Sequence, residues 1–377
     1  MDFTLTAEQT LLRDGLTRFL ATRYDLAASR VAARTGGRPD IWRAFGQDLG
    51  LLGAALPEEV GGTGGGPVEV MIIAEALGHA LVVEPFVDTA VVAAGLLRRA
   101  GGGVAAALLE RIAAGDAVVV LAAAEAETGD DWRTPATTAV RDGDDWVLDG
   151  SKIVVVGAPT SNYLIVTATT AAGPSAFLLD VDAVGGAVGG ALTMHPYRTV
   201  DDRWAADVDL VGARVPADAL LGEDGGAWPS IEQARDEGAA AVCAEAVGCM
   251  RKVLADTVEY CKQRYQFGQP IAAFQVLQHR MVDMYMEVEQ SAAAVQLAVL
   301  NLDGDAATRA RAVSAAKATV GRAARFVGQS AVQLHGGMGM TEELAIGHYF
   351  KRLTTMQYEF GSTDAHLARH ARITAPR

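Results

Sequence analysis

Two glutamates stand among residue types that suit a general base. Glu359 lies in "QYEFGST", beside a glycine and two hydroxyl side chains, where a carboxylate can remove a proton or cap a helix. Glu245 is the only ionisable carboxylate in the run "GAAAVCAEAVGCM", and burial among alanine and valine is expected to raise its pKa toward neutrality. The alternative for Glu245 is a structural carboxylate that an arginine or lysine from a neighbouring helix satisfies.

Composition argues against several classes of function. The chain has 377 residues, half of them hydrophobic, and a formal net charge of -14, whereas nucleic-acid and anionic membrane surfaces need clustered Lys and Arg. No Gly-x-Ser-x-Gly elbow marks a hydrolase. An odd number of cysteines and the lack of a leader or a long apolar span predict a reduced, cytoplasmic protein without a metal site.

Hydrophobic periodicity predicts an α+β multi-domain protein with the order α, β, α. Residues 1–115 repeat apolar side chains at helical spacing and predict an N-terminal helical domain. In residues 116–225, apolar and polar side chains alternate in short runs broken by Asp-Gly turns. This pattern predicts a central antiparallel β-barrel. Residues 226–377 predict a C-terminal four-helix bundle. Its expected helices are Ile231 to Arg264, Phe274 to Leu302, Ala306 to Leu334 and Ile346 to about Arg372.

Two motifs in the C-terminal half resemble the acyl-CoA dehydrogenase family. They are "QRYQFGQPIAAFQVLQHRMVDM" (263–284) and "QLHGGMGMTEE" (333–343). The family has the same helical, β-barrel and helical order, so the resemblance covers essentially the whole chain. The stretches "YFKRLT" and "FGSTDAHLARHA" are also similar to the small subunits of two-subunit bacterial members that act on pimeloyl-CoA-like thioesters. The resemblance implies an FAD-dependent enzyme that acts on acyl-CoA.

These motifs contain a predicted anion clamp. Its candidate cofactor-binding residues are Arg264, Phe267, Gln275, Gln333, Gly336 and Gly337. The guanidinium can fork onto a pyrophosphate while the aromatic ring covers apolar ring surface. The glutamines can bind polar edges, and the glycines let the backbone approach a ligand. The resemblance implies that they hold the adenosine diphosphate end of FAD bound to a neighbouring subunit. The alternative is a structural salt bridge and glycines that only permit close helix packing.

The segment expected near the flavin ring departs from the family. The stretch "AEAETGDDWRTP" lacks the family's glycine-serine loop, and Val154 and Val156 stand where the family has Trp and Thr. Thr128 can still donate one hydrogen bond to the flavin edge, and Ser362 is a further candidate cofactor contact. Loss of the stacking aromatic ring predicts weaker FAD binding by this chain alone.

The position of the catalytic base also differs from the pattern of the family. Most family members carry a glutamate directly before a Gly-Thr pair, but that position is Phe360, and Glu359 is one residue too early. The second family position, on the first helix of the C-terminal domain, falls on Gly238, with Glu237 one residue away. Glu245 lies two helical turns beyond Gly238 and projects from nearly the same face. We therefore expect Glu245 as the base and Glu359 as the second choice.

Two functions compete on these grounds. The first is dehydrogenation of an acyl-CoA to its trans-2-enoyl thioester, with electrons passed to an electron-transfer flavoprotein and the chain in a homodimer or homotetramer. The second is a catalytically degenerate subunit that completes the FAD site of a heteromeric acyl-CoA dehydrogenase. The residues at Phe360, Val154 and Val156 favour the second function, and the adenosine-side clamp favours neither.

Overall fold

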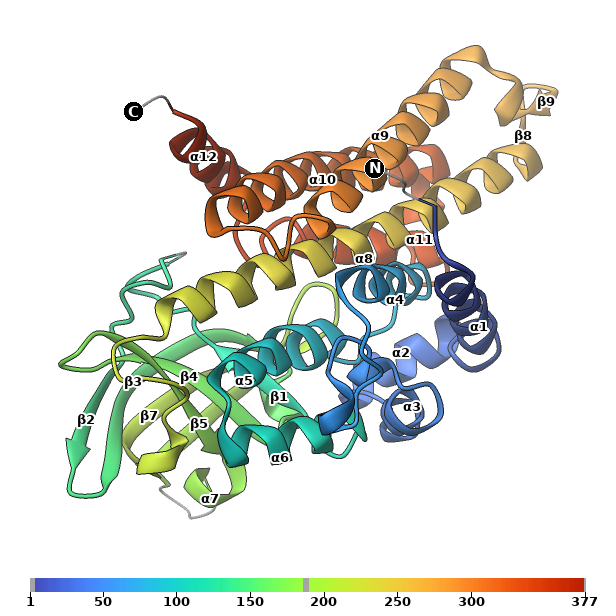
Figure 1. The fold of residues 1–377 in the computed structure, drawn as a ribbon. Helices are drawn as coiled ribbons and strands as arrows, with labels where there is room; N and C mark the ends of the chain where they lie inside the picture. The colour runs from blue at the N-terminus through green and yellow to red at the C-terminus, as the bar shows by residue number, and fades with distance from the viewer. Residues whose placement is uncertain (1–3, 130, 186–189, 376–377) are drawn as a thin grey trace. The chain divides into compact units, whose positions relative to one another are not determined.

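The computed structural model describes residues 4–129, 131–185 and 190–375, and it separates into two compact units. One, which we name the helical unit, is drawn from residues 1–30, 67–82 and 239–377. The other, the sheet unit, is drawn from residues 31–66 and 83–238. Figure 1 shows their helices and strands with labels.

Capping signals set where helices of the helical unit begin. Thr6 accepts a hydrogen bond from the amide of Gln9 and donates its own amide to the Gln9 side chain, and this capping box starts α1. Asp305 caps α10 by accepting from the amide of Ala307, and Pro67 stands in the first turn of α4. The α-helices are α1 (Ala7–Arg23), α4 (Pro67–His79), α8 (Trp228–Gln263), α9 (Gln275–Val299), α10 (Ala306–His335), α11 (Ala345–Thr355) and α12 (Thr363–Thr374). Helix α8 begins in the sheet unit and continues into the helical unit.

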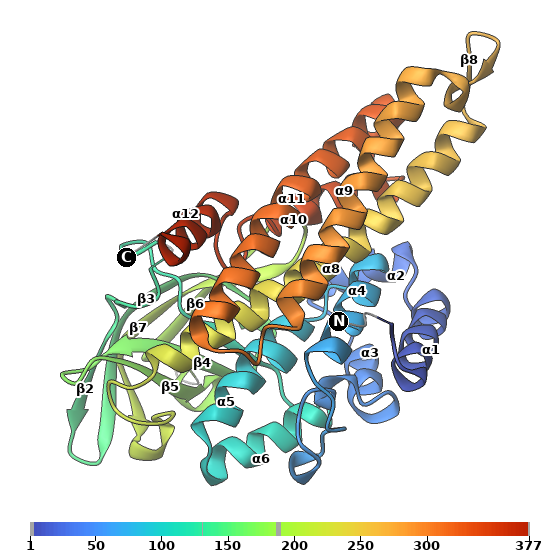
Figure 2. The ribbon, with the colours of Figure 1, turned by 45° about the horizontal axis from the view of Figure 1, so that its top comes forward.

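The long helices α8, α9 and α10 run side by side in the helical unit, as both ribbon views show (Figures 1 and 2). The hairpin of β8 (Tyr265–Gln266) and β9 (Gln269–Pro270) joins α8 to α9 at the tip. An apolar cluster is buried where the three helices meet, which stabilises their packing. It consists of Ala239, Ala240, Ala298, Leu302, Val313 and Ala316.

The single helix predicted from Ile346 to about Arg372 is wrong. The chain forms two helices there, because α11 ends at Thr355 and α12 begins at Thr363. Phe360 and Gly361 lie between them with φ of 58° and 111°, and a right-handed helix cannot pass through residues with positive φ.

Two glycines let α4 and α8 cross with their backbones in contact. A Cβ atom on Gly78 would overlap the backbone of Glu245 in α8, and one on Gly248 would overlap the backbone of Glu75 in α4. Each helix thus supplies the glycine that the other helix's backbone requires. The thiol of Cys249 donates to the carbonyl oxygen of Gly78 at 3.2 Å, which further holds the crossing where Glu245 stands.

Among the described residues, the sheet unit contains a seven-stranded sheet and several short helices. The strands are β1 (Val119–Ala122), β2 (Thr138–Asp142), β3 (Asp145–Val156), β4 (Tyr163–Thr169), β5 (Pro174–Asp180), β6 (Leu192–Arg198) and β7 (Trp204–Pro216). The helical segments are α2 (Leu26–Thr35), which begins in the helical unit, α3 (Pro39–Arg43), α5 (Ala94–Ala100), α6 (Gly102–Ala113) and α7 (Val181–Gly185), with π-helical turns at Ala44–Asp48 and Val87–Ala93.

The strands form one mixed sheet in the order β1-β4-β2-β3-β7-β6, with β5 also paired to β4. The hairpin predicted at "RDGDD" is confirmed: β2 and β3 are antiparallel, and Gly143 turns the chain with φ of 65°. The prediction of a purely antiparallel sheet is wrong at β1, which pairs parallel to β4. Parallel neighbours need a long connection, and the β2–β3 hairpin lies within it.

A buried ion pair ties the segment after β1 to β3 inside the sheet unit. Glu125 and Lys152 have fully buried side chains, and their Oε1 and Nζ atoms are 2.5 Å apart. The hydroxyl and amide of Thr137 donate to the same carboxylate oxygen, the amide of Ala136 donates to the other, and Lys152 also donates to the hydroxyl of Thr167. Burial opposes the ionisation of Glu125, but these hydrogen bonds outweigh it and hold its pKa below the usual value. Burial lowers the pKa of Lys152 to about 8.

The predicted fold class, with helical, sheet and helical segments in this order, is confirmed. In the part of the chain that the structure describes, no helix combines the length and apolarity that a membrane crossing needs.

Two buried histidines in the helical unit make folding sensitive to acid. His335 donates from Nδ1 to the carbonyl oxygen of Ala331, and His348 lies between the guanidinium of Arg30 and the carbonyl oxygen of Glu342. Burial lowers the pKa of both imidazoles, and the charge of Arg30 adds to this effect at His348.

The free energy of unfolding is therefore expected to fall as the pH drops below about 6.5. The unfolded chain binds protons at both histidines near that pH while the folded chain resists them, so the contribution is complete above it and is lost as the pH falls. Urea unfolding at about pH 7.5 and about pH 5.5 measures the difference. We expect His348→Gln to reduce it, with the exposed His195→Gln as the control. An undiminished difference in His348→Gln would contradict this account.

Candidate active site

Glu245 stands on α8 in a buried ion pair. Only 4% of the residue is exposed, and Arg352 from α11 holds both carboxylate oxygens, Nε to Oε1 at 2.8 Å and Nη2 to Oε2 at 2.9 Å. This forked geometry is the strong form of a guanidinium–carboxylate pair. The contacts match those expected of a structural carboxylate with an arginine from a neighbouring helix, and the role of Glu245 as base stays a prediction.

Glu359 binds the same arginine. Its Oε1 accepts from Nη1 of Arg352, and its Oε2 accepts from Nη2 at 3.2 Å. The side chain of Glu359 is 23% exposed, against 5% for Glu245 and 3% for Arg352. The fold thus brings the two candidate bases together around one positive charge, and solvent reaches Glu359 more readily. We name this arrangement the Glu245–Arg352–Glu359 cluster.

Phe360 occupies the position where the resemblance puts a glutamate. Its ring is partly buried against the apolar cluster where α8, α9 and α10 meet. Its φ of 58° is uncommon for a bulky residue, and the following Gly361 continues the left-handed turn. The loop therefore turns the aromatic side chain into the bundle, while the carboxylate one residue earlier binds Arg352.

The same loop contains the residue that caps α12. Ser362 precedes α12, and its Oγ accepts from the amide of Ala365 at 3.2 Å. The cap is therefore Ser362 and not Glu359. A contact between Ser362 and a cofactor stays a prediction.

The other carboxylate near a family base position is already paired. Glu237 accepts from Nη1 of Arg99 at 2.8 Å and from the side chain of Gln233 at 3.1 Å, all within the sheet unit. Its side chain is 13% exposed. These contacts give Glu237 a structural explanation that needs no catalysis.

The predicted anion clamp gathers at one end of the helical unit. Tyr260 stacks on His335 with ring centroids 4.2 Å apart, which brings the end of α8 beside the end of α10. Arg264 is exposed one turn further along, and Phe267 is 91% exposed at the hairpin tip. Phe267 and Gly268 both have positive φ, 54° and 80°, as a type I′ hairpin turn requires.

The remaining clamp residues leave room for a ligand. Gln275 and Gln333 are exposed, and a Cβ atom on Gly336 or Gly337 would meet no atom within 4 Å. Close helix packing therefore does not explain these two glycines, although the φ of 60° at Gly336 also favours glycine as the end of α10. The exposed guanidinium, aromatic ring and open glycines fit the adenosine diphosphate end of FAD.

The segment predicted to lie near the flavin ring belongs to the sheet unit, and only part of it suits flavin binding. The hydroxyl of Thr128 is buried and has no hydrogen-bond partner among the described residues, which fits a donor waiting for a ligand. Val154 is 51% exposed and sits in a β-bulge with φ of 52°, where its amide donates to Asp207 at 2.9 Å. The amide of Ile153 donates to Ala124, so the bulge and the Thr128 segment are joined.

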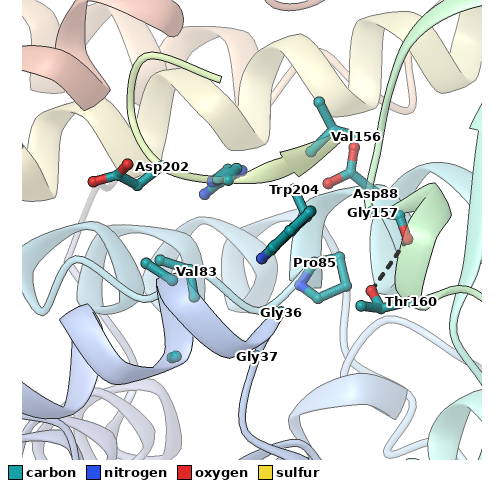
Figure 3. Close-up of a pocket in the computed structure, with 13 residues that line it drawn as sticks. Gly36, Gly37, Val83, Pro85, Asp88, Val156, Gly157, Thr160, Asp202 and Trp204 are labelled. Atoms are coloured by element: carbon teal, nitrogen blue, oxygen red, sulfur yellow. Dashed lines mark hydrogen bonds between the residues drawn. The ribbon is translucent and has the colours of Figure 1, made fainter. Parts of the chain in front are cut away.

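A shallow pocket in the sheet unit borders β3, the strand that carries Val154 (Figure 3). Val156 and the indole of Trp204 line it, and the hydroxyl of Thr160 donates to the carbonyl oxygen of Gly157 at 3.1 Å. The Nε1 atom of Trp204 is buried without a hydrogen-bond partner in the described part of the chain. An aromatic surface thus lies near Val156 although position 154 lacks one.

Sequence reasoning missed three residues that organise these surroundings. Arg352 joins the two candidate bases, Lys317 supports the loop that carries Glu359, and Trp204 lines the pocket beside Val156. A signal for Arg352 exists, because it lies seven residues before Glu359, and in the single helix predicted there the two side chains would share a face. The sequence offers no comparable signal for the other two.

The chain matches known proteins along most of its length. Three family models match it: "Acyl-CoA dehydrogenase, N-terminal domain" at residues 6–116, "middle domain" at 120–204 and "C-terminal domain" at 225–374. The curated "Acyl-CoA dehydrogenase FadE12" of Mycobacterium tuberculosis is 30% identical over 91% of this chain and 90% of its own length.

Solved structures agree with these matches. A variant of the "Tcur3481-Tcur3483 steroid ACAD" has a TM-score of 0.88 and 29% identity, covering 98% of each chain. "Crystal structure of the ChsE4-ChsE5 complex from Mycobacterium tuberculosis" has a TM-score of 0.90 and 24% identity, covering both chains fully, and shows the shared fold. Because the family models together span most of its residues, the chain belongs to the acyl-CoA dehydrogenase family, whose members are flavoprotein oxidoreductases.

Proposed function

We propose that this chain catalyses the FAD-dependent α,β-dehydrogenation of an acyl-CoA thioester to the trans-2-enoyl-CoA. The Glu245–Arg352–Glu359 cluster is the observation that carries the proposal. It offers a partly exposed carboxylate one residue from the position of the base in most family members.

Within the cluster, Glu359 is the better base and Glu245 the better support. A base must come within hydrogen-bond reach of the proton that it removes, and 23% of the Glu359 side chain is exposed. Glu245 is buried with both oxygens on Arg352, so its first effect is to fix the arginine. This reverses the order of the two candidates expected from the sequence.

The proposed cofactor is FAD, which when bound would accept the hydride from the β-carbon. Thr128 is a donor for the ring edge, and the clamp around Arg264 suits the adenosine diphosphate end. As the resemblance implies, the clamp would serve the FAD of a neighbouring subunit, so we propose a homodimer or homotetramer. Transfer of electrons to an electron-transfer flavoprotein rests on the same resemblance.

The test is the visible spectrum of the chain purified alone, followed by anaerobic addition of acyl-CoAs of several lengths. We expect flavin absorption at about one FAD per chain and bleaching by at least one acyl-CoA. Flavin without bleaching by any acyl-CoA would contradict the dehydrogenase proposal. Bleaching also identifies the acyl group.

Arg264→Gln is expected to weaken FAD binding by about 10- to 100-fold, because it removes charge-assisted hydrogen bonds to a phosphate. Titration of the FAD-free protein with FAD, followed by flavin fluorescence, measures this. The matched control is Arg280→Gln, an exposed arginine on α9 outside the clamp. Equal FAD affinities in the two variants would show that Arg264 does not bind the cofactor.

A second function, that of a partner subunit, is favoured by the residues at Phe360 and Val154. Phe360 is turned into the bundle, and exposed Val154 offers no ring for stacking. Two similar solved structures are named as pairs of chains, Tcur3481-Tcur3483 and ChsE4-ChsE5. A colourless chain that takes up FAD only when co-expressed with a second acyl-CoA dehydrogenase subunit would support this function.

A further inference from the structure

The loop between α11 and α12, residues 356–362, rests on a lysine of α10. Lys317 is 1% exposed, and its Nζ donates to the carbonyl oxygens of Met356 at 2.9 Å, Gln357 at 3.1 Å and Gly361 at 3.0 Å. The carbonyls come from the beginning and the end of the loop. One ammonium group therefore holds both ends together.

A histidine supports the middle of the same loop. His366, 2% exposed on α12, donates from Nε2 to the carbonyl oxygen of Phe360 at 3.1 Å, and its Nδ1 accepts from the hydroxyl of Ser314 at 3.2 Å. Ser314 lies three residues before Lys317 on the same face of α10, so α10 carries the lysine itself and the hydroxyl that orients His366. The loop's backbone is thus fixed to α10 along its length.

Electrostatics favours the lysine at this place. Met356 and Gln357 follow the last turn of α11, where unpaired carbonyl oxygens carry partial negative charge. A buried ammonium is costly unless its donors are satisfied, and three carbonyl oxygens accept from this one. The nearby Cys243 stays a neutral thiol at pH 7, because burial raises its pKa to about 11.

A small cavity borders the loop on this side, lined by Cys243 and Ala246 of α8 and by Met356 and Gln357 of the loop. Its volume of about 10 Å³ is close to the least that holds one water molecule. The hydrogen bonds of Lys317 therefore span the one place where packing against α8 is incomplete among the residues that line the cavity.

We propose that Lys317 is a positioning residue for the proposed base. By fixing the carbonyls of the loop it sets the left-handed turn at Phe360, and this turn directs Glu359 to Arg352. The consequence for turnover rests on the proposed function, whereas the consequence for the loop backbone does not.

The test compares Lys317→Met, which keeps the length of the side chain but has no donor, with Lys317→Arg. In Lys317→Met, amide hydrogen exchange at residues 357–362 is expected to rise by about 10- to 100-fold, with exchange in α9 unchanged. In the FAD-loaded enzyme kcat is expected to fall by about tenfold or more with little change in KM. Lys317→Arg is expected to restore both. Lys252→Met, which removes a partly exposed lysine paired to Asp256, is the matched control.

Unchanged exchange at residues 357–362 in folded Lys317→Met would overturn the proposal. So would an arginine variant that exchanges as fast as the methionine variant. If Lys317→Met does not fold, the same measurement on Lys317→Leu, which is smaller and also has no donor, decides by the same criteria. Faster loop exchange in a protein whose wild type bleaches with no acyl-CoA would support the positioning role and reject the proposed function.

Discussion

Glu359→Gln is expected to lower kcat for an acyl-CoA by about 10²- to 10⁴-fold, the usual cost of removing a general base. The free energy of unfolding is expected to change by no more than about 1 kcal/mol, because the Glu359 side chain is partly exposed and glutamine can still accept from Arg352. Stopped-flow reduction of bound flavin by the acyl-CoA measures the first quantity, and urea unfolding measures the second.

Glu245→Gln should give the opposite pattern, with a larger loss of stability and a smaller loss of kcat. It removes one charge from a buried, forked pair, so we expect the free energy of unfolding to fall by about 3 kcal/mol. Its effect on kcat should stay below that of Glu359→Gln by about tenfold or more, because it acts only through Arg352.

The pair of variants separates three possibilities. A large loss of kcat in Glu245→Gln with little loss in Glu359→Gln would make Glu245 the base, as the sequence suggested. Loss in neither variant of an active enzyme would exclude the cluster as the source of the base. Exchange of the α-protons of an acyl-CoA with D2O, followed by NMR, tests proton removal without relying on flavin reduction.

Lys152→Met is expected to lower the free energy of unfolding by about 3–5 kcal/mol. It leaves the carboxyl group of Glu125 fully buried without the lysine that neutralises its charge. At pH 7 both groups are charged, since Glu125 titrates below its usual value and Lys152 at about 8. Urea unfolding at pH 7 gives the cost.

The double variant Glu125→Gln with Lys152→Met shows whether the charge is the cause. Glutamine is neutral and still accepts from the amide of Thr137, so the double variant should be more stable than the sum of the single effects by about 1–3 kcal/mol. Simple additivity would contradict a coupled pair. The stabilisation by Glu125 is complete above its ordinary pKa and is lost as the pH falls through its lower folded value.

The order of helices and strands could be predicted because it depends on local pattern. Alternation on either side of Gly143 marks the β2–β3 hairpin, and long helical repeats mark α8, α9 and α10. The parallel pairing of β1 with β4 could not be predicted, because no local signal reports a partner that lies beyond an intervening hairpin.

The candidate site was harder to predict than the fold. The two glutamates could be singled out by residue type and position, but their meeting at Arg352 depends on the packing of α8 against α11. Phe360 has a positive φ in the turn that splits the last predicted helix. Because phenylalanine disfavours positive φ, its presence at this position did not indicate the turn. The lysine that supports this turn is 39 residues away from Met356 in the chain.

The crossing of α4 and α8 limits which residues beside the site can be substituted. Gly78 and Gly248 each face the other helix's main chain, so no trimmed side chain opposite them can make room for a methyl group. The carboxylates stand on side chains, which substitution can exchange for others at neighbouring positions. The least replaceable residues beside Glu245 are therefore two that carry no functional group, and a base can migrate along the chain while the scaffold beneath it stays the same.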